Sequence, residues 1–407
     1  METAKKPKIR FKGFTNAWEQ QTLSNISTRV FRKNTNLEST LPLTISAQYG
    51  LVDQYTYFNN RVASKNLSNY FLLKKGEFAY NKSYSDGYPF GAVKCLENYD
   101  QGVLSTLYII FKPNNKLVDS QYLIAYYDTD NWHKEVAERA SEGARNHGLL
   151  NISADDFFDT KLTISKNLSE QTKIGTFLKQ VDKLITLHQR KCEKLQNIKK
   201  SLLEKMFPKN NEKFPAIRFK GFTNAWEQCK LQEVIEEYIE KTTIQNQYPV
   251  LTSSQQKGII LQEEYFSNRQ ITTNDNIGYY VLPYGYFTYR SRSDTDIFVF
   301  NRNNIINKGI ISYFYPVFSA KNVDATFLLY RLNNGTKKQI RIAAEGTGQH
   351  VLSIKKFKEI KALFPLTEEQ TQIGKTLETI DKLLTLHQRQ VEKLQNIKKA
   401  LLEKMFV

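Results

Sequence analysis

Cysteine is scarce in this 407-residue chain, which contains only Cys95, Cys192 and Cys229. An odd and sparse set of cysteines argues against a disulfide scaffold and fits a reducing cytosol. Long hydrophobic runs are lacking as well. No stretch of about 18 apolar residues occurs, and we therefore expect no membrane span. The opening residues, Met1 to Lys8, have no apolar core and do not form a signal peptide. These absences favour a cytoplasmic protein.

The motifs of several enzyme classes are also missing. There is no Gly-x-x-x-x-Gly-Lys-Ser/Thr loop for ATP phosphates, no Asn/Asp-Pro-Pro-aromatic element of an amino-methyltransferase and no His-Glu-x-x-His pair. The cysteines lack the spacing of a zinc site. Acidic pairs such as Asp155-Asp156 are common on protein surfaces and indicate little. The sequence is therefore typical of a binding protein without catalytic equipment of its own.

Acidic residues are outnumbered, because 41 Asp and Glu stand against 58 Lys and Arg, which gives a formal net charge of +17. An excess of this size favours a polyanionic partner, with nucleic acid ahead of an anionic membrane surface. Aromatic residues make up 13% of the chain, which is far too many for a disordered protein. At about 150 residues per domain, the length suggests two to three folded domains.

A long internal repeat dominates the remaining sequence. The segment IRFKGFTNAWEQ occupies residues 9–20 and returns unchanged at residues 217–228, which is 208 positions later. A second pair of segments, residues 184–207 and 383–406, is identical at 20 of 24 positions. Such repeats indicate two copies of one structural plan.

The segments between the repeats have diverged, and only a faint register survives. Phe58 and Arg61, for example, match Phe266 and Arg269. An old tandem duplication with neutral drift is one explanation, but drift would blur all segments alike. We therefore favour a common partner for the constant segments and a different target for each variable segment.

The constant segments at residues 166–207 and 365–407 have the alternating three- and four-residue spacing of a coiled-coil seam. We expect two helices of roughly 38 residues, or about 57 Å each at 1.5 Å per residue. Related by a pseudo-two-fold axis, they would pair antiparallel and act as a ruler between the variable modules. The predicted seam residues are Val181, Leu184, Leu195, Ile198, Leu202, Ile380, Leu383, Leu394, Ile397 and Leu401.

Two further features mark these helices. Asn167 with Glu170, and Thr367 with Gln370, have the spacing of N-terminal capping boxes. His188 and His387 interrupt the seam at matching positions, and we interpret them as interface histidines rather than metal ligands. No metal site is expected in the chain.

Each variable module alternates short aromatic and β-branched runs with turn signals, as at residues 77–80, 107–111 and 286–289, which predicts strands. Short helices are expected at residues 123–138 and 327–332. The predicted fold class is therefore α+β, with two modules of about 160 residues joined by the antiparallel coiled-coil helices.

Two loops in each module are candidates for DNA contacts. One follows a predicted strand, and the other surrounds a shared Glu-Gly pair. Arg can form two hydrogen bonds with guanine, and Asn and Gln can do the same with adenine. Lys and Ser suit contacts with phosphates. Ordinary polar loops remain the alternative for any single residue. The candidate residues, with two weaker arginines last, are Lys82, Ser83, Tyr84, Arg145, Asn146, His147, Arg290, Ser291, Arg292, Thr347, Gln349, His350, Arg61 and Arg269.

With these features together, the whole chain resembles the specificity subunit of a bacterial type I restriction–modification system. The segment Leu366 to Gln370, followed by Ile373 and Leu377, is similar to the helix-opening signature of that family. The first copy departs from it by having Lys166 where Pro365 stands. The repeated Phe-x-Gly-Phe-x-x-x-Trp openings, Phe11 to Trp18 and Phe219 to Trp226, are also typical of the family.

The resemblance implies five parts and several partners. Target-recognition domains would span residues 1–165 and 216–364, conserved helices 166–207 and 365–407, and a linker 208–215. Each recognition domain would read one half of an asymmetric, bipartite site on double-stranded DNA. Two modification subunits would bring S-adenosylmethionine and methylate adenine, and restriction subunits would add ATP- and Mg²⁺-dependent work. This chain would bind no cofactor and perform none of that chemistry.

Two other functions compete with this interpretation. A self-contained DNA enzyme with fused specificity domains would cut or methylate DNA without partners. A structural coiled-coil adaptor would bind DNA without sequence preference, or not at all, and any binding would weaken steeply with salt.

Overall fold

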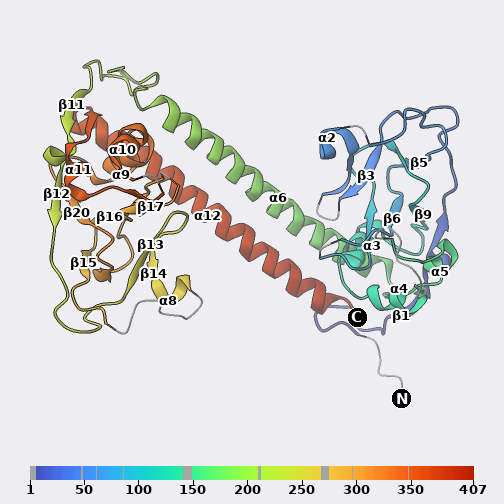
Figure 1. Cartoon of the computed structure of the whole chain (residues 1–407). Coiled ribbons are helices and arrows are strands. Elements are labelled where there is room, and N and C mark those ends of the chain that lie inside the picture. The colour runs from blue at the N-terminus through green and yellow to red at the C-terminus, as the bar shows by residue number, and fades with distance from the viewer. Residues whose placement is uncertain are drawn as a thin grey trace. The chain divides into compact units, whose positions relative to one another are not determined.

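The computed structural model describes residues 6–46, 49–60, 62–85, 87–140, 149–209, 212–266, 275–295, 297–346 and 348–407. The chain divides into two compact units, one made of residues 1–189 with 389–407 and the other of residues 190–388. Each unit therefore contains one variable module and a part of each long helix, coloured green and red in Figure 1. The predicted α+β fold class with two long helices is confirmed.

The first module is built on a four-stranded antiparallel sheet in the order β2-β9-β6-β7. Three two-stranded ribbons, β1-β10, β3-β4 and β5-β8, surround it. The bounds are β1 Glu19–Thr22, α1 Leu23–Ile26, β2 Ser27–Arg29, β3 Leu43–Ser46, β4 Gly50–Asp53, α2 Gln54–Phe58, β5 Phe71–Lys74, β6 Phe78–Asn81, β7 Ala92–Cys95, β8 Gln101–Leu104, β9 Ile109–Pro113, α3 Ser120–Tyr127, α4 His133–Arg139, α5 Ala154–Phe158 and β10 Lys161–Ile164.

The second module repeats this topology. Its sheet has the order β12-β20-β16-β18, and its ribbons are β11-β22, β13-β14 and β15-β19, with a further short pair, β17-β21. The bounds are β11 Glu227–Lys230, α7 Leu231–Val234, β12 Ile235–Tyr238, β13 Leu251–Ser254, β14 Gly258–Leu261, α8 Gln262–Tyr265, β15 Tyr280–Pro283, β16 Phe287–Tyr289, β17 Arg292–Ser293, β18 Phe300–Arg302, β19 Lys308–Ile311, β20 Val317–Ala320, α9 Ala325–Asn334, α10 Lys337–Ala343, β21 His350–Val351, α11 Ile354–Glu359 and β22 Lys361–Phe364.

The predicted strands at residues 77–80, 107–111 and 286–289 correspond to β6, β9 and β16. The helix expected at residues 327–332 is α9. The single helix expected at residues 123–138 is wrong, because two helices, α3 and α4, occupy this stretch with a break between them. Trp132 lies at the break and donates its indole N–H to the carbonyl of Tyr127, so the chain turns within the stretch that was predicted to be helical.

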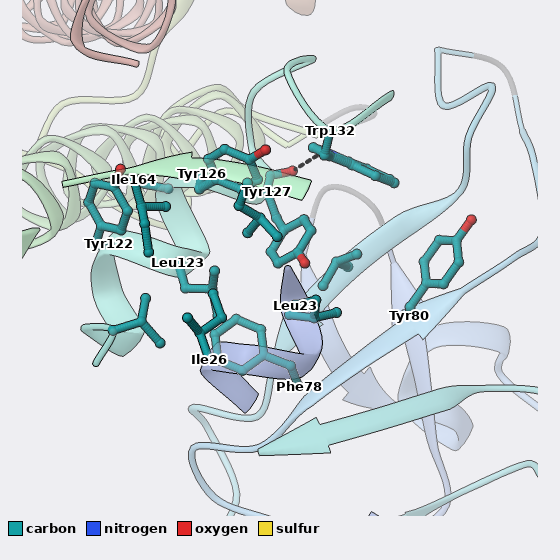
Figure 2. Close-up of a cluster of buried hydrophobic side chains, with 14 of the residues drawn as sticks. Leu23, Ile26, Phe78, Tyr80, Tyr122, Leu123, Tyr126, Tyr127, Trp132 and Ile164 are labelled. Carbon is teal, nitrogen blue, oxygen red and sulfur yellow. Dashed lines mark hydrogen bonds between the residues drawn. The ribbon is translucent and has the colours of Figure 1, made fainter. Parts of the chain in front are cut away.

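Aromatic side chains fill the core of the first module (Figure 2). Leu23 and Ile26 of α1 face Phe78 of β6, and residues of α3 pack over them. Phe78 stacks on Phe111 with ring centroids 5.2 Å apart, and Phe287 stacks on Phe318 at 5.4 Å in the second module. The two ring pairs occupy equivalent cross-strand positions, so this part of the core is the same in both modules.

The two long helices are α6, Leu168–Lys205, and α12, Thr367–Met405. Their predicted seam is only partly right. Val181 and Ile380 are buried and Leu195, Leu202, Leu394 and Leu401 are half-buried, but four predicted seam residues are exposed: Leu184, Ile198, Leu383 and Ile397.

The buried stripe of α6 instead runs through Ile174, Leu178, Val181, Ile185 and Cys192. Its direction is set at the start of the helix, where Ile174 and Leu178 belong to the core of the first module. A Cβ added at Gly175 would lie 2.4 Å from the backbone nitrogen of Tyr122, so only glycine permits this approach. Because the face with Ile174 and Leu178 is buried at the start of α6, the helical period places Ile185 rather than Leu184 on the buried side.

Reciprocal ion pairs join the two helices. In one unit, Lys398 of α12 bonds Asp182 of α6, and in the other, Lys199 of α6 bonds Asp381 of α12. The second pair is the first with the two helices exchanged, since both residues shift by the 199 positions that separate the repeats. As α6 advances from Asp182 to Lys199, its partner on α12 moves back from Lys398 to Asp381, so the helices run antiparallel.

Each long helix ends by inserting a Met-Phe pair into a module. Met405 and Phe406 are members of the core of the first module, and Met206 and Phe207 of the core of the second. The Phe406 ring lies 5.2 Å from that of Tyr122, and the Phe207 ring lies 5.8 Å from that of Phe327. The core of the N-terminal module is thus completed by the last residues of the chain.

The repeated opening segment is fixed by a buried ion pair. Arg10 donates two hydrogen bonds to Glu170, at 2.5 and 2.9 Å, and Trp18 adds a third at 3.3 Å. Arg218 and Glu369 form the same two-bond pair in the second module. Each conserved opening is therefore held against the start of a long helix.

The predicted capping boxes are wrong in part. The side chain of Asn167 accepts from the N–H groups of Ser169 and Glu170, as an N-cap should, but Glu170 is used by Arg10 instead of returning to Asn167. Gln370 binds the backbone of Asp324 and Pro365 rather than Thr367. Contacts with the module compete successfully with the local cap in both helices.

Candidate nucleic-acid interface

The two candidate loops of the second module lie side by side. The backbone N–H of Leu352 donates to the carbonyl of Ser291 at 2.9 Å, and strand β17 pairs with β21, which places Arg292 opposite Val351 and Ser293 opposite His350. The amide of Gln349 reaches Asp294 at 3.1 Å. Residues about 55 positions apart in the sequence thus form one surface, which we call the two-loop surface.

The first module has the equivalent arrangement. The N–H of Leu150 donates to the carbonyl of Lys82 at 3.0 Å, and Ser83 pairs with Leu149. The amine of Lys82 bonds the carbonyl of Ile152 at 3.2 Å. The loop after β6 is therefore attached to the segment before α5 just as the loop after β16 is attached to the segment before α11.

The side chains displayed at the two surfaces differ. In the second module, Arg290 and Arg292 are exposed, and the guanidinium of Arg292 lies 4.5 Å above the ring of Phe314. At the corresponding place the first module presents Ser83 and an exposed Tyr84. A stacked guanidinium keeps its hydrogen-bond donors free for a planar acceptor such as a base edge.

Tyr315 connects Arg290 with the rest of its module. Burial raises the pKa of this tyrosine, whereas the positive charge of Arg290 and a hydrogen bond with Thr252 oppose the shift. In the first module, Tyr108 is 3.5 Å from Thr44, the counterpart of Thr252. The same tyrosine–threonine contact therefore supports both modules beneath unlike loops.

Six candidate residues lie outside the described part of the chain: Arg61, Arg145, Asn146, His147, Arg269 and Thr347. Their roles stay predictions. Of the others, Lys82, Ser83, Tyr84, Arg290, Ser291, Arg292, Gln349 and His350 all belong to the two-loop surfaces. Phe314 was missed by the sequence reasoning, although it lies in the aromatic run Tyr313 to Tyr315, which signals more than core packing.

Within the described residues, no cluster of His, Cys, Asp or Glu is arranged to hold a metal ion. No helix in this described part is long and apolar enough to cross a membrane. The two-loop surface of the second module carries the guanidinium groups of Arg290 and Arg292 together with the carboxylate of Asp294, which accepts from Gln349.

Comparison with known proteins gives consistent matches. Residues 223–396 match the family described as type I restriction modification DNA specificity domain. The chain is 23% identical to the type I restriction enzyme MjaVIII specificity subunit of Methanocaldococcus jannaschii, over 74% of this chain and 73% of that protein. It is also 23% identical to the putative MjaX specificity subunit of the same organism, over 72% and 69% of the two chains.

A solved structure shares the fold along the full length. The S subunit of a type I restriction–modification system from M. genitalium superposes with a TM-score of 0.60, covers 99% of both chains and is 15% identical in sequence.

Proposed function

We propose that this chain is a specificity subunit of a type I restriction–modification system, a non-catalytic and DNA-recognising component, and that its two modules read the two unlike halves of one bipartite DNA site. The observation that carries the proposal is the contrast between the two-loop surfaces. Equivalent backbone bonds hold both, yet Arg290 and Arg292 face solvent in one and Tyr84 in the other. One scaffold with different side chains is what two half-sites of different sequence require.

The partners that supply chemistry are two modification subunits, which bind S-adenosylmethionine and methylate adenine, and restriction subunits, which use ATP and Mg²⁺. Support for two equivalent docking places comes from the exposed apolar residues of the long helices. Leu184, Leu187 and Ile397 belong to one unit, and their repeat counterparts Leu383, Leu386 and Ile198 belong to the other. Matching exposed apolar sets suit two copies of one partner.

The primary test is sequencing of modified adenine in cells that carry this chain with its modification subunit, compared with cells that lack this chain. A new bipartite motif is the expected result. No new modified adenine, together with DNA binding that has no sequence preference, would favour the structural adaptor. Cutting or methylation by this chain alone, with DNA, Mg²⁺, ATP and S-adenosylmethionine, would favour a self-contained enzyme.

Arg292→Ala should relax one half of the recognised site and leave the other unchanged. The substitution removes the guanidinium of the second module that we expect to bond a base edge. One such contact contributes about 1–3 kcal/mol to discrimination between bases, or roughly 5- to 150-fold. Tyr84→Ala is the matched variant and should alter only the opposite half. The motif of modified adenine measures both, and an equal change in both halves would refute the assignment.

The helix pair is proposed to set the spacer between the half-sites. Inserting four residues after Gln189 and four after Gln388 lengthens both helices at equivalent places and preserves the two reciprocal ion pairs. Four residues add about 6 Å, which corresponds to roughly two base steps of 3.4 Å. We expect a longer spacer with both half-sites intact in the modified-adenine motif. Altered half-sites with the spacer unchanged would contradict the ruler function.

A further inference from the structure

A short segment inside the diverged modules, residues 50–58 and 258–266, has kept four of its nine residues. It starts at Gly50 in the first module and at Gly258 in the second, again 208 positions later. Gln54 returns as Gln262, and the pair Tyr57-Phe58 returns as Tyr265-Phe266. Aligned on the strands that precede it, the loop that follows β6 in the first module and β16 in the second did not keep its residues in this way.

The conserved segment also has the same structure in both modules. A hairpin, β3-β4 or β13-β14, leads into a short helix, α2 or α8. The N–H of Gln54 donates to the carbonyl of Pro42, and that of Gln262 donates to the carbonyl of Val250, both at 2.9 Å. Each short helix is thereby fixed to the sheet in the same orientation.

Each short helix carries the aromatic pair in one geometry. The rings of Tyr57 and Phe58 meet edge to face with centroids 4.9 Å apart, and those of Tyr265 and Phe266 do so at 4.8 Å. The rings are not part of the hydrophobic cores that enclose the hairpins. Tyr57, Phe58 and Tyr265 are 47%, 44% and 39% exposed, and Phe266 is half-buried.

Packing of the module does not account for these rings, because exposed aromatic pairs stabilise a fold little. Their repetition indicates a ligand surface that both modules meet alike. The base sequence of the two half-sites differs, so the shared target is a feature of DNA that does not depend on base identity. Stacked bases and sugars have this property, and aromatic side chains that wedge against base steps are a known means of binding them.

The second pair has one cation near it, and two exposed carboxylates, Glu263 and Glu264, lie on the same short helix. The amine of Lys257 lies 5.9 Å from the ring centroid of Tyr265. Tyr315 lies in the neighbourhood of both Tyr265 and Arg290, which brings the aromatic pair near the two-loop surface. A cation beside an exposed ring suits a phosphate next to a base or sugar.

We propose that Tyr57-Phe58 and Tyr265-Phe266 are a second class of DNA contact, which packs against the stacked duplex at each half-site without reading its sequence. This inference deepens the proposed function and rests on it. The two-loop surfaces would choose the bases, and the aromatic pairs would hold the duplex beside them.

The experiment compares DNA binding by the assembled complex with modification subunits for wild type, Tyr57→Ala with Phe58→Ala, and Tyr265→Ala with Phe266→Ala. Fluorescence anisotropy on a cognate duplex should show a loss of affinity of about 5- to 100-fold for each double variant. A duplex without the site should lose affinity in the same proportion. The modified-adenine motif should keep both half-sites.

Tyr284→Ala is the matched control, because Tyr284 is 59% exposed in the same module but its counterpart in the first module is Lys75. It should bind as wild type. Phe58→Leu tests the role without removing the whole side chain and should give an intermediate loss if an aromatic ring is needed. Hydrogen exchange of each variant establishes that the modules stay folded.

Three outcomes would overturn the inference. Unchanged DNA affinity in both double variants would show that the aromatic pairs do not contact DNA. A changed base preference in one half-site makes the pair a sequence reader. The third outcome is a loss of modification subunits from the complex, measured by mass photometry, while the complexes that still form keep their DNA affinity. That result would show that the pair is a protein interface. Failure of the proposed function is distinct, since it would show in the wild-type chain as the lack of a bipartite motif.

Discussion

Phe406→Ala is expected to lower the free energy of unfolding of the N-terminal module by about 3–5 kcal/mol, the usual cost of removing a buried phenylalanine. Although it is the second-last residue of the chain, Phe406 is only 5% exposed. Its ring lies 6.2, 5.2 and 6.1 Å from those of Trp18, Tyr122 and Tyr126.

Hydrogen exchange with mass spectrometry measures this change where it occurs. Phe406→Ala should raise exchange in α3 and β6 of the first module, and Phe207→Ala should raise it in the second module, where Phe207 stacks on Phe327. Phe214→Ala is the control, because Phe214 is exposed. Protection that falls in the wrong module, or in neither, would contradict the assignment of the two Met-Phe pairs.

Arg10→Ala should destabilise the same module by about 3–5 kcal/mol, because it leaves a buried carboxylate without its partner. The side chain of Glu170 is completely inaccessible, and Arg10 supplies two of its hydrogen bonds. Urea unfolding at pH 7 measures the loss. Arg29→Ala is the control, since its partner Asp155 is almost fully exposed and such pairs contribute less than about 1 kcal/mol.

The dependence on pH provides a second check on this ion pair. Burial raises the pKa of Glu170, but hydrogen bonds from Arg10 and Ser165 outweigh it and lower the pKa below its ordinary value. The stabilisation is therefore complete above the pKa of the unfolded chain and declines as the pH falls toward the folded value. Arg10→Ala should weaken this acid dependence. Replacing both residues, by Arg10→Met with Glu170→Leu, should recover much of the stability.

Sequence reasoning predicted the features that rest on repetition and period. The duplication, the α+β modules and the antiparallel helices all follow from residues that recur at fixed offsets, whereas the DNA contacts of the candidate loops stay a prediction. The seam prediction was only partly right because Leu184 and Ile185 are adjacent and both are apolar. Two apolar stripes can therefore be drawn along α6, one through Leu184 and one through Ile185, and both include Val181 and Leu195. The tertiary contacts of Ile174, Gly175 and Leu178 with the first module select between them.

Other features could not be predicted because they depend on long-range partners. Glu170 has the spacing of a capping residue, and nothing local indicates that Arg10 will take it. The pairing of β17 with β21 joins loops far apart in the chain. The aromatic pair at Tyr57 and Phe58 could have been found, since its repetition is visible in the sequence. Its exposure, which distinguishes it from core residues, is known only from the structure.

The placement of Met405 and Phe406 has a consequence for synthesis of the protein. Residues 1–189 emerge first from the ribosome, yet the core they form lacks its last members until residue 406 has been made. At about 5–20 residues per second, the N-terminal module waits roughly 10–45 s for its completion. A chain that stops early keeps an unfinished first module, exposed to proteases and chaperones. We therefore expect truncation before Met405 to destabilise the first module.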